Sequence, residues 1–154
     1  MSSLLAVDLG LRTGLALYGH DGRLQWYRSQ NFGARSRLKR GVHGLLSELP
    51  DVTYLVLEGG SLAEPWQREA ERRALTVRQI DAAIWRRSLL LDREQRNGAM
   101  AKRTAGELAR SVIEWSAAPR PTSLRHDAAE AILIGLWGVL EVGWLTAMPP
   151  TLRR

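Results

Sequence analysis

A short apolar run that ends in an aspartate and a glycine constrains the fold more than any other stretch. Residues 4–7 are Leu-Leu-Ala-Val, and Asp8, Leu9 and Gly10 follow directly. Four consecutive apolar residues before a turn signal predict a strand that is buried on both faces. An ionised carboxylate at the end of such a strand is costly unless it has a partner. From this stretch alone, the partner of Asp8 could be either a bound cation or hydrogen-bond donors of the turn.

The segments that follow are expected to continue as antiparallel strands. Apolar residues 15–18 come after the turn between Gly10 and Gly14, and residues 24–29 come after a second turn at Asp21-Gly22. An Asp-Gly pair between two such runs is a strong hairpin signal. The pattern therefore predicts a three-stranded antiparallel meander at the N-terminus.

A helix and a second strand that ends in an acid come next. Residues 35–49 carry apolar side chains at helical spacing, which predicts an amphipathic helix. Residues 52–57 form another apolar run, which ends at Glu58 before two glycines. After a helical crossover this strand should lie parallel to the first. Asp8 and Glu58 would then be neighbours at one sheet edge, where two carboxylates repel unless they share a proton or a cation.

The second half of the chain is expected to add helices and one strand. We expect a loop at residues 61–66, a helix over 67–85, a fifth strand at 88–91, and helices over 100–116 and 124–137. The predicted class is α/β, with a mixed five-stranded sheet in which two parallel strands follow the antiparallel meander and helices flank the sheet. Without a repeat, 154 residues favour one domain. It is expected to span residues 1–147, with a short flexible tail at 148–154.

The last predicted helix carries two acids and a histidine at its beginning. Asp127 and Glu130 are three residues apart and share a helix face, and His126 and Glu130, four apart, also share one. The rest of the helix is nearly all apolar, as in a core helix. Solvated acids in a first turn are the ordinary alternative, because the helix dipole favours them. Together with the two strand acids, they would complete a site of four carboxylates.

Such a site suits hard divalent cations. The chain has no cysteine, which excludes thiolate metal sites and disulfides. Carboxylate oxygens suit Mg²⁺ or Mn²⁺ rather than zinc. Two such ions can clamp the attacking and leaving oxygens of a phosphodiester.

The charge balance favours a polyanionic partner. Lysine and arginine number 22 against 16 acids, a formal net charge of +6, and only Lys39 and Lys102 are lysines. Arginine matches phosphate oxygens with its planar fork, although a GC-rich genome would also enrich it. No signal sequence is evident, and the longest apolar stretch, near 131–147, contains Glu141 and fits a buried helix better than a membrane span. A cytoplasmic protein without a membrane partner is expected.

The ordered acids resemble the RuvC-type Holliday junction resolvases of the RNase H-like (retroviral integrase) superfamily. That family has D-x-G in the first strand, a glutamate ending the fourth strand, and two acids three apart opening the last helix. Here these are Asp8-Leu9-Gly10, Leu57-Glu58 and Asp127-Ala128-Ala129-Glu130-Ala131, and the resemblance spans about residues 3–140. Two features depart from the family. Glu130 replaces the usual aspartate, and His126 precedes the first helix acid, whereas some members have a histidine in that acid's own position.

The resemblance implies an RNase H-like fold and a structure-selective endodeoxyribonuclease. Its catalytic and metal-binding residues would be Asp8, Glu58, Asp127 and Glu130, with His126 as a further candidate ligand and two Mg²⁺ or Mn²⁺ ions per site. The substrate would be a four-way junction or related branched DNA, cut by symmetric nicks in a homodimer of bacterial or phage origin. The expected DNA contacts are Trp66, Arg68, Arg93, Arg96, Lys102 and Arg103.

These DNA contacts rest on two kinds of side chain. Trp66 would stack on a base, because family members carry an aromatic residue soon after the strand-four glutamate. For the basic residues a solvated helix face is the alternative, but Lys102 follows a glycine-containing loop at a helix start, where phosphates bind readily.

Three other functions remain open from the sequence. The YqgF-like branch of the same superfamily, linked to RNA processing, is compatible with Asp8-Leu9-Gly10 followed by Arg12-Thr13-Gly14. Actin-like kinases also use D-x-G hairpins, but they need two domains and this chain is too short. A nuclease-dead module that binds branched DNA is the non-enzymatic alternative, against which the presence of all four acids argues.

Overall fold

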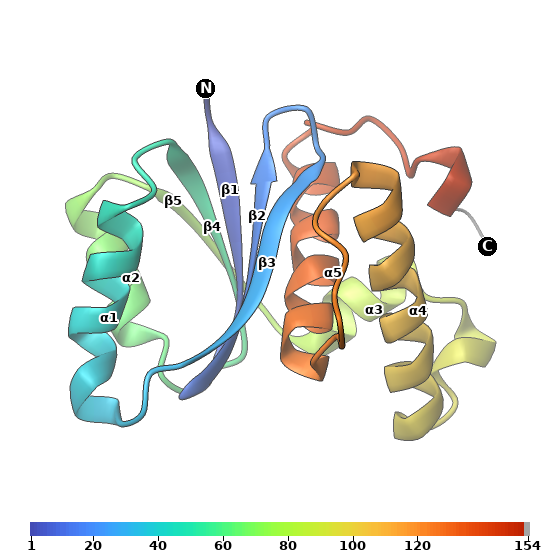
Figure 1. The fold of residues 1–154 in the computed structure, drawn as a ribbon, viewed down its shortest axis with the longest axis horizontal. Coiled ribbons are helices and arrows are strands. Elements are labelled where there is room, and N and C mark those ends of the chain that lie inside the picture. The colour runs from blue at the N-terminus through green and yellow to red at the C-terminus, as the bar shows by residue number, and fades with distance from the viewer. Residues whose placement is uncertain (153–154) are drawn as a thin grey trace.

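A central mixed sheet organises the chain in this computed structural model, which describes residues 1–152 (Figure 1). Its strands are β1 (Ser3–Asp8), β2 (Arg12–Gly19), β3 (Leu24–Asn31), β4 (Val52–Glu58) and β5 (Thr76–Ile80). The helices are α1 (Arg35–Ser47), α2 (Glu64–Arg72), α3 (Ala82–Leu89), α4 (Gly98–Ser116) and α5 (His126–Glu141). Two short 3₁₀ helices, η1 (Asp92–Gln95) and η2 (Pro150–Leu152), complete the described elements.

The strand order is β3-β2-β1-β4-β5. Strands β1, β2 and β3 pair antiparallel, whereas β4 lies parallel to β1 and β5 lies parallel to β4. The predicted meander, the parallel pairing of the two acid-bearing strands and the mixed five-stranded sheet are therefore confirmed. Because β1 is central, every residue from Leu4 to Val7 is inaccessible to solvent, which explains its unbroken apolar run.

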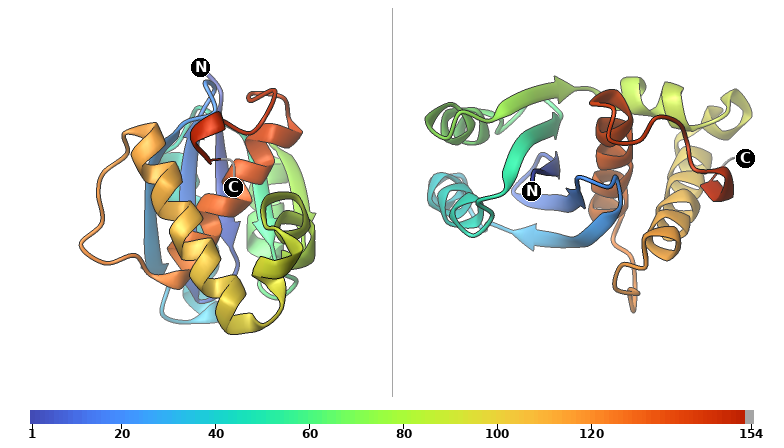
Figure 2. Two further views of the ribbon diagram at one scale, coloured as in Figure 1. Left: turned by 90° about the vertical axis from the view of Figure 1, so that its right-hand side faces the viewer. Right: turned by 90° about the horizontal axis from the view of Figure 1, so that it is seen from above.

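Helices cover both faces of the sheet and make two cores (Figures 1 and 2). Alternate residues of β1 serve the two sides. Leu4 and Ala6 belong to the core shared with α5 and α4, and Leu5 and Val7 belong to the core shared with α1 and α2. Helix α5 lies between the sheet and α4, so it is buried on most of its surface.

The apolar stretch around α5 is thus a core helix, as predicted. Tyr18 of β2 donates a hydrogen bond from its buried hydroxyl to the carbonyl of Ile132, which fixes the helix against the sheet. Among residues 1–152, no helix has the length and apolar character needed to cross a membrane.

The predicted helix over 67–85 and the strand at 88–91 are wrong. Helix α2 ends at Arg72, and Ala74 then adopts a positive φ of 56°, which stops the helix. Thr76, Val77 and Ile80 are β-branched and form β5 instead, at the sheet edge. Leu89 and Leu90 are buried at the end of α3, so their apolar character reflects helix packing and not a strand.

The last residues pack more closely than expected. Residues 150–152 form η2, and Leu152 is 3% exposed within the core beside α4. This part of the expected flexible tail therefore lies on the domain, and residues 153–154 of that tail are outside the described part of the chain.

Candidate active site

Two strand ends place the first pair of carboxylates. Asp8 is the last residue of β1, Glu58 is the last residue of β4, and the two are paired in the parallel register. The backbone N–H of Leu9 donates to the carbonyl of Glu58 at 3.1 Å, so the chains remain joined just beyond the strands. The predicted neighbourhood of the two acids is confirmed. The two carboxyl groups are close enough for each to influence the pKa of the other.

Helix α5 brings the third carboxylate to the same edge. Its beginning lies directly against β2 at Gly14, where a Cβ atom would come within 1.9 Å of the carbonyl oxygen of Asp127. Only glycine permits this approach. This close approach of α5 to β2 places Glu130, which is one turn into the helix, over the strand ends. The exposed fraction of Glu130 is 8%.

Asp8, Glu58 and Glu130 form one compact cluster. Each offers a carboxylate oxygen that lies within 4.8 Å of the other two. Burial and the charges of Glu130 and Glu58 raise the pKa of Asp8 to about 8. Burial and the charge of Glu130 also raise the pKa of Glu58, although Arg86 partly opposes this shift. Three desolvated carboxylates that repel one another make a hard, all-oxygen donor set, and such a set fits Mg²⁺ or Mn²⁺.

Two basic side chains contact Glu130, one from its own helix and one from α3. His126 Nε2 lies 3.0 Å from Glu130 Oε1, and Arg86 Nη2 of α3 lies 3.3 Å from the same oxygen. The Nε atom of Arg86 is buried and has no hydrogen-bond partner. His126 thus contacts a carboxylate of the cluster, and its role as a metal ligand stays a prediction.

Asp127 lies beside the cluster and outside its inner group. Its Oδ2 accepts a hydrogen bond from Ser29 Oγ of β3 at 2.9 Å, and its Oδ1 accepts one from the N–H of Ala128 at 2.7 Å. Its charge nevertheless contributes to raising the pKa of Asp8. The structure therefore gathers three of the four predicted acids and holds the fourth at their margin through Ser29.

Sequence reasoning missed Arg86 and Ser29. Arg86 fell at the end of a helix predicted to run from 67 to 85, so its face could not be assigned. The signal that was present is Asp81, whose side chain accepts from the N–H of Ile84 and caps α3. Ser29 had no local signal, because its partner Asp127 is 98 residues away.

Comparison with solved structures identifies the fold. No family profile and no curated protein sequence matches the chain. A structure of Thermus thermophilus RuvC superposes with a TM-score of 0.66 over 96% of this chain and 99% of that one, at 16% identity. The yeast mitochondrial Holliday junction resolvase Ydc2 superposes with a TM-score of 0.54 over 93% of this chain and 82% of its own, at 10% identity. The chain has the RuvC fold.

The RuvC fold is RNase H-like, so the predicted fold class is confirmed. The same match supports the predicted resemblance to RuvC-type resolvases. Within this fold the acidic cluster lies where two parallel strands end beside the start of the last helix. In open α/β sheets, sites of this kind form at the carboxyl ends of strands.

The predicted nucleic-acid contacts differ in where the RuvC fold places them. Arg68 is exposed on α2 and pairs with Glu64 at 2.9 Å. The others, all exposed near η1 and the start of α4, are Arg93, Arg96, Lys102 and Arg103. Trp66 differs from them, because it is completely buried in the core between α2 and the sheet.

The expected loop position of Trp66 is wrong. Pro65 occupies the start of α2, a position that proline favours, so the segment forms a helix and not a loop. The indole packs edge to face on Phe32, with 6.3 Å between ring centroids. It offers no exposed face on which a base could stack.

Proposed function

We propose that this protein is a divalent-metal-dependent endonuclease that cleaves Holliday junctions or related branched DNA. The observation that carries the proposal is the cluster of Asp8, Glu58 and Glu130, whose carboxylate oxygens lie within 4.8 Å in a RuvC fold. Asp127 stands beside them and completes the four acids of the resemblance. Such a set can hold the divalent cations that would neutralise the charge that develops on phosphodiester oxygens during hydrolysis.

The carboxylates would hold the metal through rigid elements. Asp8 and Glu58 are fixed by paired strand ends and Glu130 by a buried helix, so the donor oxygens need little rearrangement. Two Mg²⁺ or Mn²⁺ ions, when bound, would supply Lewis-acid stabilisation of the attacking and leaving oxygens. The raised pKa of Asp8 supports this assignment, since a cation would relieve the repulsion that keeps a proton in the cluster.

Arg86, His126 and Ser29 would position the acids. Arg86 and His126 contact one oxygen of Glu130 and orient its carboxylate. Ser29 donates to Asp127 and holds that side chain at the margin of the cluster. His126 remains a candidate metal ligand, since its ring lies within hydrogen-bond distance of a carboxylate in the cluster.

The branched substrate follows from the fold neighbours and the charge. One neighbour is RuvC and the other is named as a Holliday junction resolvase. The net charge of +6 supports binding of a polyanion despite the acidic site. Arg68, Arg93, Arg96, Lys102 and Arg103 are the proposed backbone contacts, and a bacterial or phage-encoded cytoplasmic enzyme is the proposed setting.

A homodimer with two sites would account for symmetric nicks. Among residues 1–152, the exposed large apolar side chains are Met1, Leu11 and Leu91. Sedimentation with and without a four-way junction would measure the state directly.

The test is cleavage of matched substrates by wild type and by two variants. Four-way junction, flap, linear duplex and RNA substrates are incubated with Mg²⁺ or Mn²⁺. Wild type should cleave the junction, and Asp8→Asn and Glu58→Gln should each reduce cleavage by about a hundredfold or more, because each removes a charged ligand. Junction binding should be retained.

The other outcomes decide between functions. Cleavage confined to RNA would favour the RNA-directed alternative, and binding without any metal-dependent cleavage would favour a DNA-binding module. Near wild-type cleavage by either variant would show that the acidic cluster is not the active site.

A further inference from the structure

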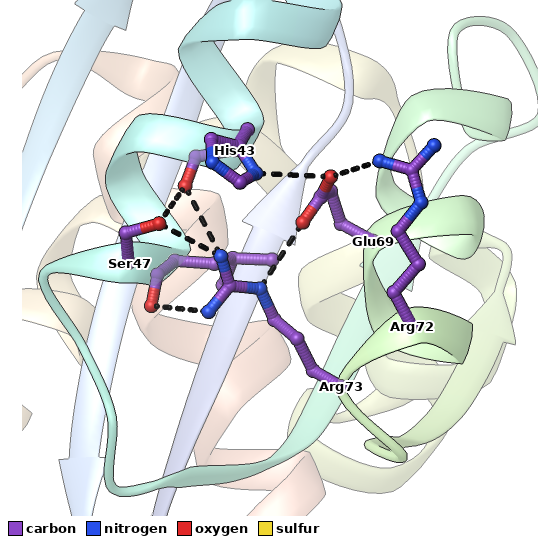
Figure 3. Close-up of polar contacts among 6 residues, drawn as sticks. His43, Ser47, Glu69, Arg72 and Arg73 are labelled. Atoms are coloured by element: carbon purple, nitrogen blue, oxygen red, sulfur yellow. Dashed lines mark hydrogen bonds and ion pairs between the residues drawn. The ribbon is translucent and has the colours of Figure 1, made fainter.

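The two helices on the sheet face opposite α5 share a polar cluster of their own. Helices α1 and α2 pack against each other, and Glu69 of α2 lies at the centre of their contact (Figures 1 and 3). The side chain of Glu69 is only 4% exposed. It contacts Arg72 Nη1 at 2.9 Å, Arg73 Nε at 3.1 Å and His43 Nδ1 at 3.2 Å. A buried carboxylate held by two arginines and a histidine is an ordered feature, unlike a chance surface pair.

The three basic side chains around Glu69 are held to different degrees. Arg73 also donates to Ser47 Oγ and to the carbonyls of His43 and Leu46, so it ties the two helices together (Figure 3). Arg72 and His43 each use one nitrogen on Glu69 and remain 58% and 61% exposed. Burial alone would raise the pKa of Glu69, but hydrogen bonds from Arg73 and His43 hold that pKa below its usual value. The buried charge therefore persists and orients Arg72 and His43 at the surface.

Those oriented groups line a basic groove. The groove has a volume of about 310 Å³, and its lining residues are Ser36, Lys39, Arg40, His43, Glu69 and Arg72. A smaller cavity beside it shares Lys39 and Arg72 and is also lined by Arg68. Within residues 1–152, neither Lys39 nor Arg40 has a hydrogen bond or an ion pair, and both are exposed. Without counting His43, the three cations Lys39, Arg40 and Arg72 against the carboxylate of Glu69 leave two unneutralised positive charges in the groove.

The groove runs along α1 and α2 on the sheet face opposite α5. Strands β1 and β4 are parallel, and α1 returns the chain to the start of β4. The first residues of α1 are therefore near the edge at which β1 and β4 end, as Figure 1 shows. Ser36, Lys39 and Arg40 are in the first half of α1, whereas Arg68 is at the midpoint of α2 and Glu69 and Arg72 are in its second half. The groove thus begins near the end of the sheet that carries the acids and extends away from it along the face opposite α5.

We propose that the groove between α1 and α2 binds the sugar–phosphate backbone of nucleic acid as a second contact, separate from the acidic cluster. Phosphodiester oxyanions match its chemistry, since Arg40 and Arg72 present planar donor forks, and Lys39 and Ser36 add an ammonium group and a hydroxyl. The adjoining cavity lengthens the groove, although Arg68 there pairs with Glu64, and an elongated groove suits successive phosphates better than one small anion. The inference rests on the proposed function: a branched substrate has arms in different directions, and this groove would hold an arm other than the one at the acids.

The test measures binding of DNA without divalent ions, so that cleavage plays no part. Fluorescence anisotropy compares a four-way junction with a linear duplex over a range of salt concentrations. Lys39→Ala with Arg40→Ala should weaken junction binding by roughly tenfold or more and lower the slope of log affinity against log salt by about 2. The linear duplex should be affected less. Lys39→Arg, which keeps the charge, should bind as wild type does.

Arg37→Ala is the matched control, because Arg37 is an exposed residue on the same helix but outside the groove lining. If Arg37→Ala weakens the junction complex as much as Lys39→Ala or Arg40→Ala alone, the effect is one of total charge and the groove proposal falls. Thermal midpoints equal to that of wild type ensure that the comparison concerns binding.

Two further measurements distinguish a small phosphate ligand from a nucleic-acid backbone, and the groove proposal from the nuclease proposal. Inorganic phosphate is titrated at constant ionic strength with the His43 ring resonances as the readout. Saturable phosphate binding that needs Lys39, together with junction binding that does not, would assign the groove to a small phosphate ligand and overturn the proposal. If the groove variants bind the junction as wild type does and wild type cleaves it, the groove proposal is refuted and the nuclease proposal stands. If binding depends on the groove but no protein cleaves the junction, the nuclease proposal is refuted and the groove proposal stands.

Discussion

The ionised carboxylate of Asp8 that a metal site requires also lowers the stability of the metal-free protein. Its pKa is raised from 3.8 to about 8 by burial and by Glu130 and Glu58. A carboxyl group whose folded pKa exceeds its unfolded value contributes its full stability below pH 3.8, and that stability is lost as pH rises through about 8. The free energy of unfolding should therefore fall across this range when no divalent ion is present.

Asp8→Asn should accordingly stabilise the metal-free protein at neutral pH. The full shift would correspond to about 4 kcal/mol between pH 4 and 7, but the site is partly open to solvent, so about 1–2 kcal/mol is expected. Mg²⁺ should raise the thermal midpoint of wild type and leave that of the variant nearly unchanged. Calorimetry from pH 5 to 9, with and without Mg²⁺, makes the comparison. A variant less stable than wild type throughout would contradict the assigned electrostatics.

Arg86 should set the acid limb of the pH–rate profile. Its charge lowers the pKa of Glu58 and its Nη2 contacts Glu130. Arg86→Ala should therefore raise the pKa of Glu58 further and move the acid limb of metal-dependent cleavage to higher pH, with a loss of about tenfold or more at neutral pH. Arg87→Ala, at the exposed neighbouring position, is the control. An unshifted profile for Arg86→Ala would show that its contact with Glu130 serves packing alone.

At the residue scale, chain order was enough to predict the acids but not their neighbours. Asp8 and Glu58 each follow an apolar strand and precede a glycine, so a parallel pairing brings them together. Asp127 shares a helix face with Glu130, yet Ser29 turns its carboxylate into a separate hydrogen bond. Such a choice between partners depends on a strand remote in sequence, and no local pattern encodes it.

At the scale of elements, Gly14 controls how closely α5 approaches β2. A Cβ there would lie 1.9 Å from the carbonyl oxygen of Asp127, which belongs to the backbone and cannot turn aside as a side chain could. Gly14→Ala should therefore displace the start of α5, destabilise the protein by about 2–4 kcal/mol and reduce cleavage, because Glu130 moves with the helix.

Gly44→Ala is the matched control, since a Cβ at Gly44 in α1 meets nothing within 4 Å. It should be neutral or stabilising by about 0.5–1 kcal/mol, because alanine is the better helix former. Thermal or urea unfolding measures both variants. Equal stability of the two would mean that α5 can move away from β2 at little cost.

The elements themselves were predictable where the apolar period was unambiguous. The meander, α1 and β4 follow from alternation, turn residues and helical spacing, and they are where the sequence predicts them. The elements between residues 67 and 91 could not be predicted, because α2, β5 and α3 are each short and the spacing of their apolar residues resembles that of one helix. Only pairing with β4 selects the strand at Thr76–Ile80, and that pairing is a tertiary contact.

At the scale of the whole molecule, an acidic centre is placed within a basic chain. Four acids lie about one sheet edge, while the formal net charge is +6. A phosphate backbone is thus attracted by the molecule as a whole and repelled locally until cations occupy the centre. The same division explains why neutralising the centre and neutralising the groove should affect binding in opposite directions.

The double variant Asp8→Asn with Glu58→Gln should bind a four-way junction several-fold more tightly than wild type when no divalent ion is present. The gain should shrink as salt rises, because screening shortens the range of the lost repulsion. Glu48→Gln is the control, since Glu48 is an exposed acid at the far end of α1. Anisotropy titrations at several salt concentrations measure all three proteins. The local repulsion is refuted if the double variant gains no more than the control does, since the acids would then not face the bound backbone.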